Sequence, residues 1–151
     1  VDVPVVAAVD GVAMAGGFEL MQAADIVLVS DEARIADNHI NFGMIPAGGS
    51  TQRLPRLVGR QIALGLLLSG QRLSGLDAVR YGLAYRSFPQ AEFDDEVERF
   101  VATLADRQRS AVTAIKRLVY ARHGLDSEID VAVKHIGHQG TAAFGQMGAQ
   151  Q

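Results

Sequence analysis

Residues 9–25, VDGVAMAGGFELMQAAD, contain the pattern that decides the fold of this chain. They complete an apolar run over residues 5–9 that lacks polar alternation, which is typical of a buried strand. Asp10-Gly11 interrupts the run, and Gly16-Gly17 then opens a helix that carries Glu19 in its first turn. The spacing therefore predicts a buried strand, a turn and a short helix.

The start of this helix has the composition of a chemical site. Adjacent glycines let a ligand approach the backbone, and the free N–H groups of a helix start can hold negative charge. Glu19 lies three residues after Gly16, so a carboxylate would lie beside a polarising amide. Acid–base chemistry next to a carbonyl needs this combination. The alternative is that Glu19 is a charged first-turn residue favoured by the helix dipole.

The chain resembles the crotonase (enoyl-CoA hydratase/isomerase) family, strongly over residues 4–90 and loosely after that. Members of that family carry a strand, an N-G or D-G turn, a Gly-Gly-x-Glu-Leu helix start and a following Asp, here Asp25. The resemblance continues in the segments Ala33-Arg34-Ile35-Ala36, Gly43-Met44-Ile45-Pro46, Gly49-Ser50-Thr51-Gln52-Arg53-Leu54 and Gly82-Leu83-Ala84.

The resemblance implies an α/β fold: the C-terminal part of a crotonase-like ββα spiral over residues 1–90, then an all-helical trimerisation region over 91–151. It implies a lyase of fatty acid metabolism that adds water to an enoyl-CoA thioester or moves its double bond. Coenzyme A would enter as part of the substrate, with no separate cofactor. Alternatives are a thioester or C–C hydrolase of the same fold, and a non-catalytic assembly module.

The family pattern also implies the site residues. Glu19 and His39 would be catalytic, and the Gly16 amide would hold the thioester oxygen. The residues expected to contact the substrate are Met14, Ala15, Ile45, Pro46 and Ala47.

Two of these positions depart from the family pattern. Hydratases carry a second glutamate 20 residues after the first, and here 39 − 19 = 20 falls on a histidine. A histidine also holds water and moves protons near neutral pH, but it lacks a carboxylate's charge. His39 is therefore either a catalytic partner, which Asp37 would orient across an extended 33–39 segment, or a residue that only lines the pocket. Ala47 replaces a usual glycine, which adds a methyl group beside the water site.

The element pattern changes near Pro89. The predicted strands cover residues 5–9, 26–30, 33–36 and 84–88, and the predicted helices between them cover 17–23, 50–57, 59–68 and 75–81. Ser74 and Gly82 are the expected cap and stop of the last of these helices. Beyond Pro89 only helices are expected, over 91–107, 111–122 and 127–137.

Composition excludes several classes of protein. A net charge of −3 argues against binding of nucleic acid or anionic membranes, and no apolar run is long enough to span a membrane. The absence of cysteine excludes disulfides and Cys-based metal sites and fits a reducing cytoplasm. His135-x-x-His138 has helical metal-ligand spacing but no third ligand, so we interpret it as a solvated face and expect no metal.

We expect an incomplete oxyanion hole and self-association. The family's Ala-x-x-Gly-x-Asp-type loop, which supplies the second amide, has no match in residues 1–151, as expected of a fragment, a cleaved product or a divergent short member. Apolar residues at helical spacing predict a homotrimer or hexamer, or pairing with a chain that supplies this lobe. They are Phe93, Val97, Phe100, Leu104, Ile115, Leu118, Val119, Ile129, Val133 and Ile136.

Overall fold

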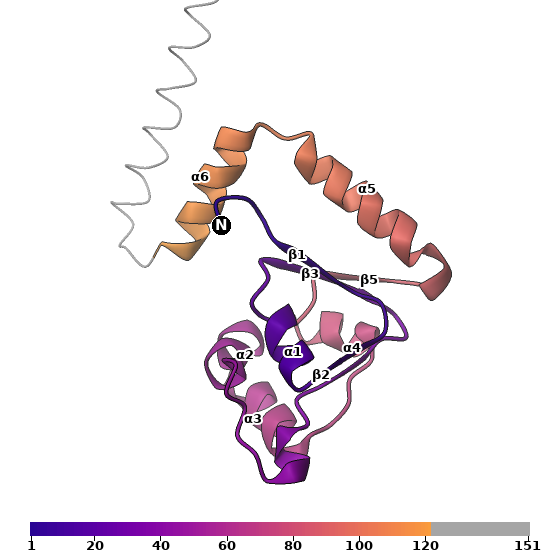
Figure 1. Cartoon of the computed structure of the whole chain (residues 1–151), viewed down its shortest axis with the longest axis vertical. Helices are drawn as coiled ribbons and strands as arrows, with labels where there is room; N and C mark the ends of the chain where they lie inside the picture. The colour runs from indigo at the N-terminus through magenta and orange to yellow at the C-terminus, as the bar shows by residue number, and fades with distance from the viewer. Residues whose placement is uncertain (122–151) are drawn as a thin grey trace, which may run out of the picture. The chain divides into compact units, whose positions relative to one another are not determined.

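The computed structural model describes residues 1–121 (Figure 1). These residues belong to two compact units. The larger unit, Val5–Thr103, contains every strand of the described chain, and the smaller one joins Val1–Pro4 to the chain from Leu104 onward. The domain boundary expected near residue 90 stays a prediction, and the helix expected over 127–137 lies outside the described residues.

Five short strands form two parallel sheets in the larger unit. The first sheet has the order β1-β3-β5 and the second pairs β2 with β4. Val6 of β1 is opposite Ile26 of β3, and Met14 of β2 is opposite Ala36 of β4. The strands are β1 (Val6–Val9), β2 (Val12–Met14), β3 (Ile26–Ser30), β4 (Arg34–Ala36) and β5 (Arg86–Phe88). Because both sheets are parallel, neighbouring strands end on the same edge.

Helices connect and follow these strands. From residue 90 to residue 120 the regular structure is entirely helical, as the sequence pattern predicts. The α-helices are α1 (Gly16–Met21), α2 (Ser50–Val58), α3 (Arg60–Ser69), α4 (Gly75–Arg80), α5 (Phe93–Ala105) and α6 (Arg109–Tyr120), and the 3-10 helices are η1 (His39–Phe42) and η2 (Gln90–Glu92). None of the helices in residues 1–121 is long and apolar enough to cross a bilayer.

Two local predictions were wrong. Strand β2 was missed, because its three residues carry no turn signal of their own and form a strand only by pairing with β4. The extended stretch expected over 33–39 ends at Ala36, and the chain then turns into η1 at His39. The N–H of Ala15 donates to the Ala36 carbonyl at 3.1 Å, which extends the β2–β4 ladder by one bond.

Helix α4 is bounded by the residues expected at its ends. The Ser74 hydroxyl accepts from the Asp77 N–H at 3.1 Å, and the Asp77 carboxylate accepts from the Ser74 N–H at 3.1 Å, which makes a reciprocal cap. Gly82 has φ +77°, and the Leu83 N–H donates to the Ala78 carbonyl at 2.8 Å. A left-handed glycine with this bond ends a helix in the Schellman arrangement.

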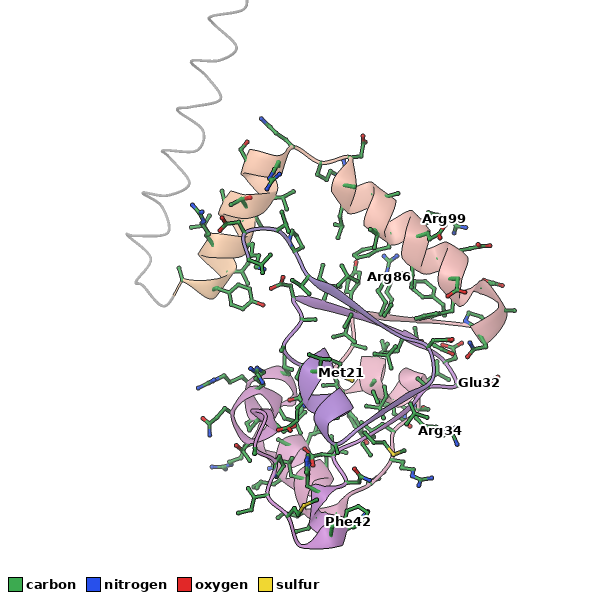
Figure 2. The ribbon with its side chains drawn as sticks, in the orientation of Figure 1. Met21, Glu32, Arg34, Phe42, Arg86 and Arg99 are labelled. Carbon is green, nitrogen blue, oxygen red and sulfur yellow. The ribbon has the colours of Figure 1, made fainter. Side chains whose placement is uncertain are left out.

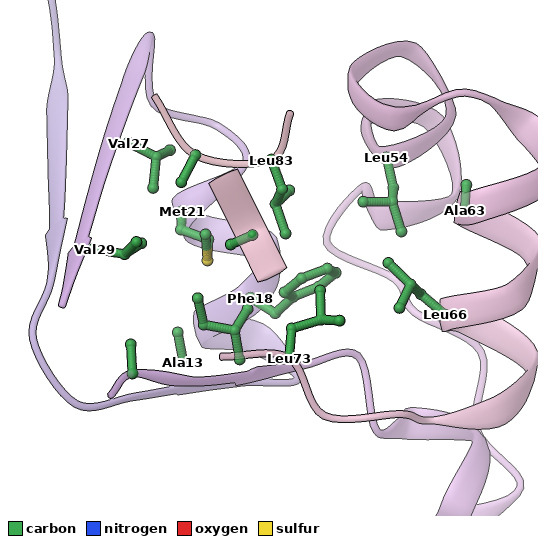
Figure 3. Packing of buried hydrophobic residues seen from close by; sticks show 14 residues of the cluster. Ala13, Phe18, Met21, Val27, Val29, Leu54, Ala63, Leu66, Leu73 and Leu83 are labelled. Carbon is green, nitrogen blue, oxygen red and sulfur yellow. The ribbon is translucent and has the colours of Figure 1, made fainter. Parts of the chain in front are cut away.

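One core joins the sheets to helices α1 to α4 (Figure 3). Phe18 and Met21 of α1 are 0% and 2% exposed, and Figure 3 shows them with Val27 and Val29 of β3. Burial of side chains of this size contributes roughly 1.5–3 kcal/mol each. Because Phe18 and Met21 share one face, their burial fixes the rotation of α1 about its axis and therefore the direction of Glu19.

Polar contacts join the two segments of the smaller unit to each other. Lys116 of α6 donates to the Val3 carbonyl at 2.9 Å, and Arg117 lies 3.1 Å from the Asp2 carboxylate. The hydrogen bond from Arg117 and the charge of its guanidinium hold the pKa of Asp2 below the usual value. Exposed ion pairs of this kind stabilise a fold only slightly.

Candidate active site

The site is built where β2 and β4 end. Met14 and Ala36 are opposite each other at the last positions of these strands. Beyond Met14 the chain enters α1, which carries Glu19, and beyond Ala36 it enters η1, which begins at His39. The parallel pairing therefore delivers both side chains to the same edge of the sheet, although 20 residues separate them.

Glu19 is buried with a defined partner. Its side chain is almost fully enclosed, and Oε1 accepts the backbone N–H of Ser50 at 3.1 Å. Ser50 is the first residue of α2, so the carboxylate lies at the positive end of that helix. Gly48 leaves the room for it, because a Cβ there would lie 2.6 Å from Oε2 of Glu19.

His39 faces Glu19 on one side and Asp37 on the other. Its Nε2 lies 4.0 Å from Oε2 of Glu19, and its Nδ1 lies 2.7 Å from Oδ1 of Asp37. The 4.0 Å gap is too long for a direct hydrogen bond, but it has the length that one water at about 2.8 Å from each atom would bridge. The expected Asp37–His39 contact is confirmed, although a turn at Asn38 and not an extended strand produces it.

The start of α1 offers unpaired backbone N–H groups. Gly16 and Gly17 are exposed, and within residues 1–121 the Gly16 N–H has no acceptor. Ala15, just before them, has φ 49° and ψ −116° and is the only non-glycine residue of the described chain with positive φ. Such conformations cost about 1–3 kcal/mol and occur mostly at functional sites. A bound oxyanion is the ligand that suits this helix start.

The five residues expected to contact the substrate lie on the two segments that carry Glu19 and His39. Met14 is the last residue of β2, Ala15 is the residue before α1, and both are half-buried. Ile45, Pro46 and Ala47 lie on the loop between η1 and α2, where Ile45 is 81% exposed. Phe42, at the end of η1, also lies at the surface (Figure 2). Substrate contact by these residues stays a prediction.

Ser50, Gly48 and Gln22 also belong to the site, although they were not predicted from the sequence. Gln22 directly follows α1, and its Nε2 donates to the Phe18 carbonyl at 3.0 Å and to the Ser50 hydroxyl at 2.7 Å. This side chain therefore ties α1 to the start of α2. Gly48-Gly49 before Ser50 was the available signal, since paired glycines before a helix mark a close backbone approach.

Within residues 1–121, no three His, Asp or Glu side chains lie close enough together to hold a metal ion. His135 and His138 lie outside the described residues.

The chain matches a known family over most of its length. The model of the family described as enoyl-CoA hydratase/isomerase matches residues 1–142. The carnitinyl-CoA dehydratase of Proteus mirabilis is 34% identical over 125 residues, which are 83% of this chain and 48% of the relative. The carnitinyl-CoA dehydratase of Escherichia coli K12 is 34% identical over 117 residues, or 78% of this chain and 45% of the relative.

Solved structures agree with the sequence matches. A putative enoyl-CoA hydratase from Thermobifida fusca, in complex with acetoacetyl-CoA, superposes with a TM-score of 0.85 at 30% identity, covering 93% of this chain and 56% of that one. The enoyl-CoA hydratase of Bacillus anthracis gives a TM-score of 0.82 at 27% identity, covering 95% and 60%.

These superpositions define an α/β protein of the crotonase fold, so the predicted fold class is confirmed. The chain belongs to the enoyl-CoA hydratase/isomerase family. It spans about half the length of the carnitinyl-CoA dehydratases that it matches.

Proposed function

We propose that this chain carries the acid–base groups of an acyl-CoA enzyme that adds water to a 2-enoyl thioester or removes it from a 3-hydroxyacyl thioester. The observation that carries the proposal is the buried Glu19 carboxylate facing the partly buried His39 ring, with Oε2 and Nε2 4.0 Å apart. The Gly16 N–H at the start of α1, which has no acceptor within residues 1–121, supports it. The names of the dehydratase relatives and the acetoacetyl-CoA complex of the T. fusca neighbour support a thioester substrate.

The reaction needs two proton movements and one place for charge. Water bridges Glu19 and His39, and its oxygen bonds to C3 of the enoyl group as one of these side chains accepts its proton. The π electrons of the C2–C3 bond move toward the thioester oxygen, which accepts the Gly16 N–H. C2 then takes a proton from the same pair, so the net change is the addition of one water.

The neighbouring loops supply the binding surface. We propose that Met14, Ala15, Ile45, Pro46 and Ala47 contact the acyl-CoA. An isomerase would use the same groups without adding water, by removing a proton from one carbon and returning it to another. Product analysis separates the two reactions, because only hydration forms a 3-hydroxyacyl thioester.

We also propose that the protein is a homotrimer or a hexamer of the cytoplasm that works in fatty acid metabolism. Ile115 and Val119 support assembly, because they lie four residues apart on α6 and are 61% and 75% exposed. Phe93 was wrongly included in the uncovered stripe, since it is 3% exposed. A folded monomer at micromolar concentration in sedimentation would exclude assembly.

The test uses the full-length protein with a short 2-enoyl-CoA as substrate. Turnover is measured as the loss of absorbance of the conjugated thioester. Glu19→Gln removes the carboxylate charge with little change of shape and should lower kcat by roughly 10²–10⁴-fold. Glu32→Gln, at an exposed position, is the matched control and should leave kcat unchanged. Unchanged turnover in Glu19→Gln would remove Glu19 from the mechanism. Thiol release without hydration would favour a thioester hydrolase, and no turnover by the parent protein would favour an assembly module.

A further inference from the structure

We propose that Asp37 is a positioning residue: it fixes the tautomer of His39, so that Glu19 and His39 together hold the reacting water by both of its hydrogens. The inference rests on the proposed function for the identity of that reaction. The assignment of the tautomer rests on the geometry around His39 alone.

Asp37 determines which ring nitrogen carries the hydrogen. Its Oδ1 lies 2.7 Å from Nδ1 of His39, and the residue is 1% exposed. An ionised carboxylate only accepts hydrogen bonds, so the short contact requires the hydrogen to be on Nδ1. In the neutral ring, Nε2 then has a lone pair and no hydrogen.

Two acceptors therefore face each other across the site. Nε2 of His39 and Oε2 of Glu19 are 4.0 Å apart and, in this state, cannot bond directly. A water molecule satisfies both by donating one hydrogen to each. With hydrogen bonds of about 2.8 Å the angle at the water oxygen is about 90°, close to the H–O–H angle. The oxygen lone pairs are left free, and these are the electrons that form the new bond to C3.

A purely structural role explains Asp37 less well. The only other hydrogen bond of its side chain within residues 1–121 is a long one, in which the His39 backbone N–H donates to the same Oδ1 at 3.4 Å. The second oxygen, Oδ2, is buried with no partner in the described chain. A buried carboxylate in this state lowers stability. The position of the Asp37 carboxylate is explained by its contact with Nδ1 of His39, which fixes the tautomer of the ring.

The first measurement needs no substitution at Asp37. In full-length protein with ¹⁵N-labelled histidine, the ring nitrogen shifts of neutral His39 should show Nδ1 protonated and Nε2 unprotonated. The chain has four histidines, so His39→Gln identifies the signals that belong to this ring. Asp37→Asn should move the population toward the Nε2–H tautomer, because an amide can donate to Nδ1. A parent protein with His39 already in the Nε2–H form would overturn the proposal.

The second measurement asks whether Asp37 acts through His39. Asp37→Asn should lower kcat by at least about 10²-fold, as loss of the correct tautomer does where a histidine moves the proton. The double variant Asp37→Asn/His39→Gln should be no slower than His39→Gln alone. Asp95→Asn, at an exposed position on α5, controls for loss of one negative charge. Losses that multiply in the double variant would assign Asp37 a separate role and overturn the proposal.

The two measurements separate the inference from the proposed function. If the tautomer is as stated but the protein does not turn over enoyl thioesters, the proposed function fails and the role of Asp37 toward His39 stands. If the protein is active but the tautomer is the other one, the proposed function stands and this inference fails.

Discussion

Replacement of Gly48 by alanine should displace the Glu19 carboxylate and leave the fold intact. The added Cβ would lie 2.6 Å from Oε2 and 2.9 Å from Cδ of Glu19. Ordinary contacts between such atoms begin at about 3.5 Å, so the carboxylate has to move by about 1 Å. Gly48 does not have a positive φ, so alanine adds no backbone strain. A misplacement of about 1 Å costs about 10²-fold in rate where groups must be aligned.

The assay compares Gly48→Ala with Gly65→Ala in the full-length protein. Gly65 lies inside α3, where an added Cβ meets nothing within 4 Å, so this variant should keep parental kcat. Gly48→Ala should lower kcat for a 2-enoyl-CoA by about 10²-fold, with unfolding free energy within about 1 kcal/mol of the parent. Parental turnover in a folded Gly48→Ala would refute the claim that the position of this carboxylate limits the rate.

Two further predictions concern stability. Gly75→Ala would place a Cβ 1.9 Å from the Ser30 carbonyl oxygen, a backbone atom that cannot move aside, so the free energy of unfolding measured in urea should fall by about 3 kcal/mol or more. For Gly65→Ala the free energy of unfolding should stay the same or rise by about 0.5–1 kcal/mol. Equal unfolding midpoints for the two variants would contradict this prediction. Hydrogen bonds from Ser74 hold the pKa of Asp77 below the usual 3.8, so this carboxylate stabilises α4 above pH 3.8 and stops doing so as the pH falls through its folded-state pKa. Asp77→Asn should therefore be less stable than the parent at pH 7, and this difference in stability should narrow in acid. A difference that persists to the lowest pH at which the parent folds would show that it does not come from the charge of the Asp77 carboxylate.

Local chemistry was readable from the sequence, and long-range contacts were not. The apolar run before Asp10 predicted β1, and Ser74 with Gly82 predicted both ends of α4, because each signal acts within a few residues. The contact of Ser50 with Glu19 joins positions 31 residues apart. The tertiary fold creates this contact, so the local signal of Gly48-Gly49 can mark a close approach at Ser50 but cannot name Glu19 as its partner.

The candidate site was predictable as a set of residues but not as a geometry. The resemblance to the family, whose hydratases carry a second glutamate 20 residues after the first, singled out His39 as the partner of Glu19. Their 4.0 Å separation follows from the parallel pairing of β2 with β4. That pairing was invisible because β2 is three residues long. Strands of this length are specified by their neighbours and not by propensity.

The pairing of Met14 with Ala36 gives a fixed reference position in each of the two segments that carry the site. Glu19 lies five positions past one strand end (19 − 14) and His39 three past the other (39 − 36), so one inserted residue in either interval would separate the two groups and leave both sheets paired. The backbone fixes where position 39 is, and the side chain there decides the chemistry. A family built in this way can replace a carboxylate by an imidazole at one position and obtain a different proton carrier without rebuilding its core.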